Sequence, residues 1–434
     1  MSVATIAVIT LFVILLVLLL LKVPVSYSVG IATTITLLIS LPWLPAVTTI
    51  MQQMTTGIDS FALLAIPFFI LAGDIMNSGG IANRLVNFSK SLVGSFPGGL
   101  LYVNIISAML FGAVSGSAAA SASAIGGILS KRMEKENYPK PFSASLNITS
   151  STVGLIIPPS NILIVFALAS AGTASVEALF LAGYLPGILL GVAFIIWAAI
   201  VAVKRIFPKE DSVPLKQLWE DFRKAILSIL MIIVVVGGIV FGVFTATEGA
   251  VIAVVYALIL SLVYREIKVK DLGAIIVKSS KTVAVVMFLI STSMALSWLF
   301  AYNEIPQMIS SFMLSSFESP IFMLLAINIT LLIVGTFMDM TPAVLIFTPI
   351  FLPIVTEIGM NPVHFGIVMV LNLCIGLCTP PVGTLLFIGS GVSGVEVSKV
   401  IKPLLPFLAV MVFVLLLVTF IPQISLFLPR LFGK

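Results

Sequence analysis

A membrane-length apolar stretch of the chain is interrupted at its centre by two consecutive prolines. Residues 151–170 read STVGLIIPPSNILIVFALAS, and the two prolines are followed by Ser160 and Asn161. Proline donates no backbone hydrogen bond and clashes with the preceding helical turn, so a helix through this stretch must break. Non-helical backbone at membrane depth is tolerated only where protein or a polar cavity covers it. The stretch therefore predicts a broken helix beside an intramembrane cavity.

The composition places the whole chain in the lipid bilayer. The chain has 434 residues, of which 60% are hydrophobic and only 9% are charged. These values lie far outside those of soluble domains, so we expect an all-α, polytopic membrane protein. The net charge of +5 therefore indicates no nucleic-acid partner. The positions of the basic residues along the chain are more informative than the net charge, because they indicate the topology.

The distribution of basic residues predicts the topology. Lys and Arg concentrate in the segments 83–90, 130–141, 203–225 and 264–281, with a smaller group at Lys399 and Lys402. The positive-inside rule places these segments in the cytoplasm. The loops 245–248, 302–320 and 357–364 contain no Lys or Arg and are expected outside. Residues 3–21 form a first apolar run with no basic residue before it, which indicates a retained span with its N-terminus outside.

Two regions fit re-entrant hairpins better than complete spans. Region 97–130 lies between two cytoplasmic segments, and it is too long for one span and awkward for two. Its centre is rich in Gly, Ser and Ala, and we expect a turn at 115–117. Region 320–356 leaves an outside loop and returns to one, with an expected turn within 334–343. The two hairpins should therefore enter from opposite faces.

The two halves of the chain align weakly but in the same order. Segments 81–88, 112–118, 157–161 and 175–186 match 305–312, 335–341, 379–383 and 394–406 at an offset of about 219–224 residues. With the predicted topology, this indicates an inverted-repeat transporter with two hairpins and two proline-broken helices, at 140–170 and 363–392. The expected division is 1–80 scaffold spans, 81–203 first repeat, 204–281 amphipathic linker and scaffold spans, and 282–434 second repeat and last span.

The hairpin tips and helix breaks supply the candidate site residues. Half-helix N-termini favour an anionic substrate, and unwound carbonyls and side-chain oxygens suit sodium ions. The candidate substrate-binding residues are Ser115, Ser117, Ser121, Asn161, Thr341 and Thr384. The candidate ligands for two or more sodium ions are Ser115, Gly116, Pro158, Ser160, Asn161, Gly335, Met338, Asp339, Thr341, Cys378, Thr379 and Pro381. We expect no Lys or Arg in this central cavity.

Several of these residues have a structural alternative. Asp339 is the only carboxylate predicted at the midplane. An acid there is energetically costly and is by default a functional candidate. The alternative is a structural hydrogen bond at the hairpin tip. Ser121 and Ser123 fit helix packing as well as ligand binding. Asp74 and Glu248 lie near helix ends and are expected to be structural. We expect Cys374 and Cys378 to be small packing residues. We expect His364 to lie in an interfacial loop.

The motifs LAIPFFILAGDIMNSGGIANRLVNF, GAVSGSAAASASAIG, LIIPPSNILIVFA, GTFMDMTPA and CTPPVGTLLF resemble the large membrane subunit of tripartite ATP-independent periplasmic (TRAP) transporters. The resemblance covers almost the entire chain. It implies an elevator-type fold in a bacterial inner membrane and sodium-driven import of an organic acid anion. It also implies two partners, a periplasmic substrate-binding protein and a small four-span subunit on a separate chain. C4-dicarboxylates and sialic acids are the substrates implied, with the sialic acid branch preferred.

Other functions are weighed against this one. An intramembrane aspartyl protease is disfavoured, because LAGD lacks a Gly-x-Gly-Asp pattern and FMDM lacks a catalytic companion. Neither H-E-x-x-H nor G-x-S-x-G occurs, so no enzyme is expected. A channel is less suited to occluding hairpins than a carrier is. A self-sufficient sodium- or proton-coupled carboxylate carrier of the same fold, without a binding protein, stays open on the residues alone.

Overall fold

The computed structural model describes residues 3–205, 207, 213–317 and 319–434, and these residues form helices and no strand. Eight of the described helices are long and apolar enough to cross a membrane. A further pair, Lys140–Ile156 and Asn161–Ala169, qualifies as one span bent by 51°. The fold is therefore all-α and polytopic, as the composition predicts.

The first half contains a hairpin followed by a broken helix. Its helices are α5 (Ile81–Val93), α6 (Gly99–Ser115), α7 (Ala118–Lys135), α8 (Lys140–Ser151), α9 (Val153–Ile156), α10 (Asn161–Ala169) and α11 (Val176–Arg205). The turn between α6 and α7 is made by Gly116, whose φ of +61° is strained for residues with a side chain. Between α9 and α10 the chain passes through the Pro158–Pro159 bond, which is cis.

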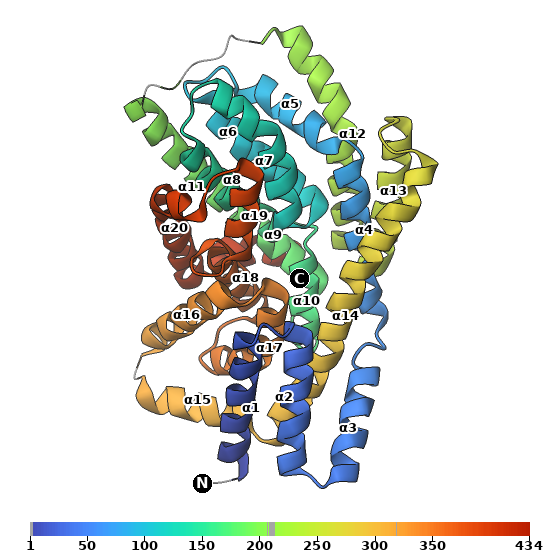
Figure 1. The fold of residues 1–434 in the computed structure, drawn as a ribbon, viewed down its shortest axis with the longest axis vertical. Helices are drawn as coiled ribbons and strands as arrows, with labels where there is room; N and C mark the ends of the chain where they lie inside the picture. The colour runs from blue at the N-terminus through green and yellow to red at the C-terminus, as the bar shows by residue number, and fades with distance from the viewer. Residues whose placement is uncertain (1–2, 206, 208–212, 318) are drawn as a thin grey trace.

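The second half also contains a hairpin followed by a broken helix. Its helices are α15 (Ile305–Ser316), α16 (Pro320–Phe337), α17 (Met340–Glu357), α18 (Pro362–Cys378), α19 (Thr384–Ser393), α20 (Val397–Phe420) and α21 (Gln423–Leu431). The break between α18 and α19 again contains a cis bond, Pro380–Pro381. In Figure 1, α5 lies in the upper part of the molecule and α15 in the lower part. The two hairpins thus begin at opposite ends, and their tips meet near the middle.

Glycine pairs bring each hairpin into close contact with its broken helix. A Cβ built on Gly112 of α6 would lie 2.5 Å from the Cα of Gly154 in α9. A Cβ on Gly376 of α18 would lie 2.5 Å from the Cα of Gly335 in α16. Both distances are shorter than any ordinary carbon contact, so only glycine allows the backbones to approach this closely. Close approach at small residues stabilises helix pairs in membranes, where no hydrophobic effect drives helices together.

The remaining helices form a scaffold beside these two halves. They are α1 (Val3–Leu20), α2 (Val25–Ser40), α3 (Trp43–Thr56), η1 (Phe61–Leu64), α4 (Ala65–Ser78), α12 (Leu215–Val240), α13 (Ala246–Val263), η2 (Val269–Asp271) and α14 (Leu272–Tyr302). In Figure 1, α4, α12, α13 and α14 run along the right-hand side, and α4 packs against both α13 and α14. Glu248 completes a capping box with Thr245 at the start of α13, which is a structural role of the kind expected for it.

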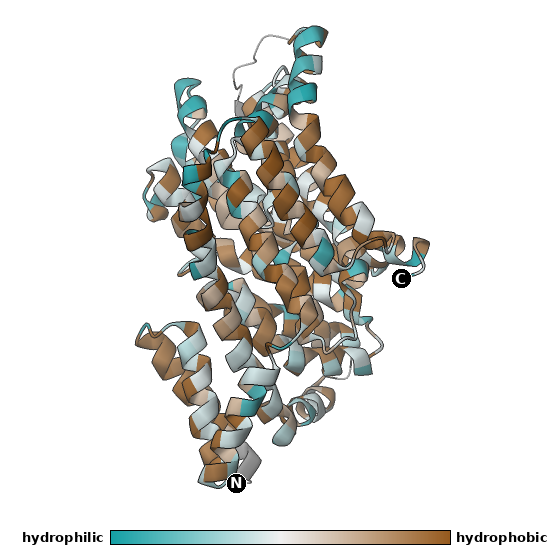
Figure 2. Cartoon of the chain, turned by 90° about the vertical axis from the view of Figure 1, so that its right-hand side faces the viewer, coloured by the Kyte–Doolittle hydropathy of each residue, from teal (hydrophilic) through white to brown (hydrophobic). Residues whose placement is uncertain are grey.

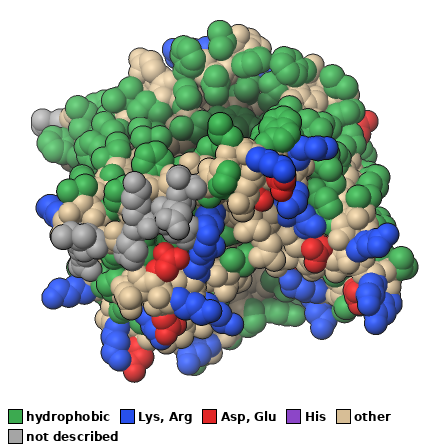
Figure 3. Space-filling model, turned by 90° about the horizontal axis from the view of Figure 1, so that it is seen from above, with side chains coloured by type: hydrophobic (Ala, Val, Ile, Leu, Met, Phe, Trp, Pro, Cys, Tyr) green, Lys and Arg blue, Asp and Glu red, His purple; other side chains and the backbone are tan. Residues whose placement is uncertain are grey.

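Basic side chains gather at one end of the molecule. Figure 2 shows hydrophobic residues along the central helices and hydrophilic ones at the upper end. Seen from above in Figure 3, this end carries many Lys and Arg side chains. The upper end is thus the one that the positive-inside rule assigns to the cytoplasm, and the orientation of the N-terminus stays a prediction.

One sequence-based interpretation needs correction. His364 is not an interfacial loop residue: it lies in the first turn of α18, is 1% exposed, and its Nδ1 is 2.5 Å from Ser425 Oγ in α21. It is buried because α21 covers the start of α18. The amphipathic surface segment expected at 204–225 stays a prediction, and its residues 215–225 form the first part of α12, where Leu215 and Trp219 are exposed. Residues 206 and 208–212 of that segment lie outside the described residues.

Candidate functional site

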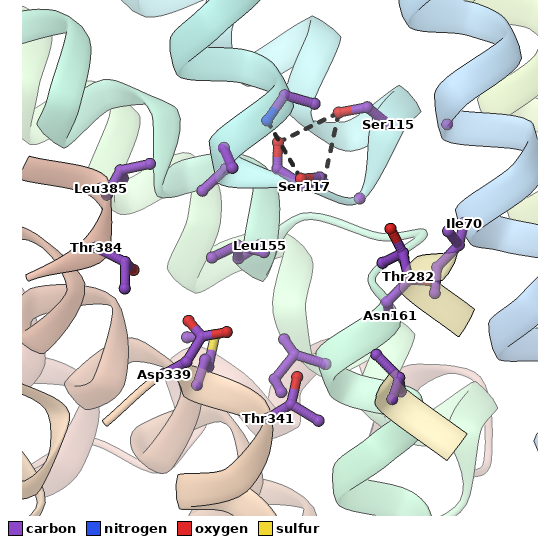
Figure 4. Close-up of a pocket in the computed structure, with 18 of the residues that line it drawn as sticks. Ile70, Ser115, Ser117, Leu155, Asn161, Thr282, Asp339, Thr341, Thr384 and Leu385 are labelled. Atoms are coloured by element: carbon purple, nitrogen blue, oxygen red, sulfur yellow. Dashed lines mark hydrogen bonds between the residues drawn. The ribbon is translucent and has the colours of Figure 1, made fainter. Parts of the chain in front are cut away.

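A cavity of about 510 Å³ lies where the two hairpin tips meet the two helix breaks. Its wall comes from both halves of the chain and from the scaffold helices α4 and α14. Figure 4 shows labelled polar side chains from both halves around this space, with Ser115 and Ser117 on one side and Asp339 and Thr341 on the other. The Gly-, Pro- and Ser-rich breaks therefore surround a polar space, as their sequences indicate.

Four helix N-termini converge on the cavity. The first residues of α7, α10, α17 and α19, which are Ala118, Asn161, Met340 and Thr384, all line its wall. The first amides of a helix have no partner within the helix and carry a partial positive charge. A side chain caps α7, where Ala120 N donates to Ser117 Oγ at 3.2 Å, but none caps α10, α17 or α19. The cavity therefore offers amide donors to a negatively charged group.

The tip of the first hairpin contacts the first helix break. Ser117 N donates to Ser115 Oγ at 3.4 Å, which holds the two serines across the turn. A Cβ on Gly116 would lie 3.2 Å from the carbonyl oxygen of Pro159 and 3.6 Å from Nδ2 of Asn161. The buried Oδ1 of Asn161 has no hydrogen-bond partner among the described residues. Serine, carbonyl and amide oxygens are thus gathered at this tip, and one of them lacks a partner.

The tip of the second hairpin places a carboxylate in the cavity. Asp339 precedes the first residue of α17, and its side chain is exposed to the cavity although it lies deep among the helices. Figure 4 shows Asp339 between Thr384 of α19 and Thr341 of α17. A charged carboxylate is costly within a membrane unless a polar or ionic partner compensates it. The arrangement therefore suits a bound cation.

Seven of the candidate residues line this cavity: Ser115, Gly116, Ser117, Asn161, Asp339, Thr341 and Thr384. Five others make contacts within the fold. Ser121 Oγ donates to Ala108 O at 3.4 Å inside the first hairpin, Ser160 Oγ to Leu155 O at 2.5 Å, and Thr379 Oγ1 to Ile375 O at 2.7 Å. Cys378 is buried with its Sγ 3.8 Å from Ile148 O, and Gly335 packs on Gly376. Pro158, Met338 and Pro381 are not among the described residues of the cavity wall.

The expectation that no Lys or Arg lies in the cavity is wrong. Lys278, from the second turn of α14, is part of the wall, together with Thr282 one turn further on. Asp74 and Asn77 from the end of α4 also contribute. The positive-inside rule assigns the whole basic cluster at 264–281 to the cytoplasm, but α14 begins at Leu272 and carries Lys278 into the wall. A lysine and an aspartate within apolar stretches were the signal that could have indicated them.

The side chains of the site suit a hard cation better than a transition metal. The part of the chain that the structure describes contains no group of three or more His, Cys, Asp or Glu side chains placed to hold a metal ion. The available donors are instead hydroxyl, amide, carboxylate and carbonyl oxygens, including the unpartnered Oδ1 of Asn161. Such a donor set fits sodium or another hard ion.

A membrane-spanning helical protein with two hairpins, two broken helices and a polar cavity between them has the features of a secondary transporter. Residues 12–424 match the family of the DctM component of the tripartite ATP-independent periplasmic transporter. The chain belongs to this family, whose members are the large permease subunits of transporters and not enzymes.

Curated relatives match the chain over nearly its full length. The chain is similar to the protein YgiK of Salmonella typhimurium, with 51% identity over 95% of this chain and 94% of YgiK. It is 37% identical to the C4-dicarboxylate TRAP transporter large permease protein DctM of Rhodobacter capsulatus, over 94% of this chain and 96% of DctM. It is also 37% identical to the sialic acid TRAP transporter large permease protein SiaM of Vibrio cholerae, over 88% of this chain and 89% of SiaM.

A solved structure shares the fold. The chain is similar to the YdaH transporter of Alcanivorax borkumensis, with a TM-score of 0.63 over 86% of this chain and 87% of that one. The sequence identity is only 13%, so the likeness concerns the fold alone.

Proposed function

We propose that the chain moves an organic acid anion, of the sialic acid or C4-dicarboxylate type, through its central cavity together with sodium ions. A periplasmic binding protein delivers the anion, and a small membrane subunit on a separate chain completes the transporter in a bacterial inner membrane. The relatives named for these substrates support the substrate class. The main structural support is the convergence of four helix N-termini on one cavity.

The cavity has the size and the donors that a small organic acid needs. A volume of about 510 Å³ lies within the range of small-molecule pockets. The amides at the starts of α10 and α19 have no side-chain cap and can donate to a carboxylate, whereas the start of α17 already lies beside the carboxylate of Asp339. The hydroxyls of Ser115, Ser117, Thr341 and Thr384 supply further hydrogen bonds. The anion therefore binds largely to helix ends and neutral groups in the depth of the site.

Sodium coupling is supported by one carboxylate and one unpartnered amide. Asp339 supplies a negative charge at the second tip, and Asn161 Oδ1, beside the first tip, is a buried acceptor that has no partner in the described part of the chain. A cation at each tip satisfies both groups. The ions would supply positive charge beside the anion, so that the two bind together.

An elevator motion is supported by the way in which the two halves interlock. Hairpin helix α7 packs on α19 of the other half, and α8 packs on α20. Together with the two glycine contacts, this joins both tips and both breaks into one body that moves as a unit. The cavity lies between this body and the scaffold helices α4 and α14, where sliding exposes it to one side and then the other.

The test is uptake into liposomes that contain this chain and its small subunit. Binding protein loaded with labelled sialic acid or succinate is added outside, with and without an inward sodium gradient. We expect uptake only when binding protein and sodium are both present. Equal uptake without binding protein supports the self-sufficient carrier instead, and equal uptake without sodium refutes the coupling.

A further inference from the structure

An ion pair lies at the cavity wall, at the end where basic residues cluster. Lys278 Nζ of α14 is 2.6 Å from Asp74 Oδ1 of α4, and Ser279 Oγ donates to Asp74 Oδ2 at 2.7 Å. Both acceptor oxygens of Asp74 are therefore occupied, by residues that are neighbours in sequence. The pair differs in exposure, because 63% of the Lys278 side chain is accessible and only 17% of that of Asp74.

Lys278 also begins a row of residues that leads into the cavity. Lys278, Thr282 and Val286 follow one another at helical spacing on α14, and all three line the wall. Among the described wall residues, Lys278 is the only Lys or Arg. An anion that moves along this face of α14 therefore meets one cationic side chain before it reaches the helix N-termini of the tips.

The exchange of Asp74 for another anion costs little. The Lys278 side chain is largely exposed, so water screens its charge and solvates the ammonium when it leaves Asp74. Asp74 also keeps the hydrogen bond from Ser279 after Lys278 leaves, so its charge does not lose every partner. An ammonium group has three donors, of which Asp74 engages one.

We infer that Lys278 is an anion-docking residue at the mouth of the cavity. Its ammonium exchanges Asp74 for the carboxylate or sulfonate of an organic anion that passes between the cavity and the basic end of the molecule. Between transport events, the ion pair with Asp74 holds the Lys278 side chain at the wall. This inference rests on the proposed function as an anion transporter, and it adds a cationic residue of the scaffold to a described wall that contains no other Lys or Arg.

A small sulfonate reagent tests the docking without knowledge of the natural substrate. Thr282→Cys introduces a thiol one turn beyond Lys278, and the native Cys374 and Cys378 are buried and 0% exposed. The purified transporter with its small subunit is treated with 2-sulfonatoethyl methanethiosulfonate or with the neutral methyl methanethiosulfonate. The ratio of the two modification rates measures how strongly the site attracts an anion, with the unsubstituted chain as the background.

The decisive comparison is with the double variant Lys278→Gln/Asp74→Asn in the Thr282→Cys chain. This variant removes one charge of each sign, so the net charge of the wall is unchanged. If Lys278 leaves Asp74 to bind anions, the double variant has a lower anionic-to-neutral ratio, by about fivefold, as expected for loss of one charge-assisted contact. Lys278→Arg keeps the charge and should keep the ratio.

Lys281→Gln is the matched control, since Lys281 is exposed on α14 but is not part of the described wall. It should leave the ratio unchanged. Equal ratios in the parent and the double variant overturn the inference, because Lys278 is then locked to Asp74. A fall with Lys281→Gln as large as that in the double variant also overturns it, because the attraction then belongs to the whole basic cluster. A ratio that depends on Lys278 without any uptake in liposomes supports the docking residue and refutes the proposed function.

Discussion

The two glycine contacts lead to a graded prediction about packing. Gly376 of α18 and Gly335 of α16 face each other, but they do not have equal room. A Cβ on Gly376 would lie 2.5 Å from two backbone atoms of Gly335, whereas a Cβ on Gly335 would lie 3.2 Å from Gly376 Cα and 3.3 Å from a flexible Leu373 methyl group. Gly127 in the interior of α7 has no atom within 4 Å of its built Cβ. The three positions form a series from crowded to open.

The expected energies follow from these distances. For Gly376→Ala, the crossing of α16 and α18 must open by about 1 Å to restore ordinary contact, and overpacking of this kind costs about 1–3 kcal/mol. For Gly335→Ala, a shift of a few tenths of an ångström is enough, and we expect a loss below about 1 kcal/mol. Gly127→Ala should be neutral or should stabilise by about 0.5–1 kcal/mol, because alanine is the better helix former.

The assay is thermal unfolding of the purified transporter in detergent at a fixed heating rate. The midpoint should fall most for Gly376→Ala, less for Gly335→Ala, and not at all for Gly127→Ala. Gly335 is also a candidate sodium ligand, and alanine keeps its carbonyl oxygen. The sodium dependence of uptake by Gly335→Ala should therefore match that of the parent. A midpoint of Gly376→Ala equal to the parent's refutes the close crossing, and a selective loss of sodium affinity in Gly335→Ala refutes the packing role.

Three further predictions concern the site and the topology. Asp339→Asn should abolish sodium-dependent uptake in liposomes while the protein still assembles with its small subunit, since an amide of nearly equal shape lacks the negative charge; uptake at the parental rate makes Asp339 structural. Ser160→Ala and Thr379→Ala should reduce the initial rate only partly, because both hydroxyls bond to backbone carbonyls of the preceding turn, and complete loss would point to direct ion binding. Cysteines at Lys131 and Glu357 should react with an impermeant thiol reagent from opposite sides of the membrane; labelling of both from the periplasm contradicts the inverted arrangement.

The sequence predicts the parts of the site that depend on local chemistry. The paired prolines at 158–159 and 380–381 predict breaks, because each proline removes a backbone donor and clashes with the preceding turn. Single prolines such as Pro349 and Pro406 instead lie within continuous helices. The turn of the first hairpin follows from Gly116, which tolerates a positive φ. Asp339 stands out because a carboxylate in an apolar region requires a partner. These features need no knowledge of the tertiary fold.

The features that the sequence analysis missed depend on packing between distant segments. Asp74 and Lys278 meet only because α4 packs against α14, so neither segment alone indicates that the two residues pair. The segment GMNPVHFG does contain a helix-start signal, since Asn361 caps α18 and Pro362 is its first residue. That signal would have placed His364 in a helix, but its burial depends on α21, some 60 residues away, whose Ser425 is its partner. Ser121 lies inside the hairpin because of the rotation of α7 about its axis. A run rich in Gly, Ser and Ala has no distinct apolar face, so the sequence does not indicate which side of this helix is buried.

The formal charges of the cavity wall connect anion binding to cation binding. The described wall contains two aspartates and one lysine, and the Asp74–Lys278 pair is neutral, so no formal positive charge of the wall is left to neutralise Asp339, which has only the partial charge of the α17 N-terminus beside it. An organic anion placed near an unneutralised Asp339 is repelled, and a sodium ion at Asp339 removes that repulsion. Thermodynamic linkage then requires that sodium and the anion raise each other's affinity by the same factor. In the Asp339→Asn variant the repulsion is absent from the start, so the half-saturating concentration of the anion should no longer depend on sodium. A parental sodium dependence of anion binding in that variant would place the coupling ion elsewhere.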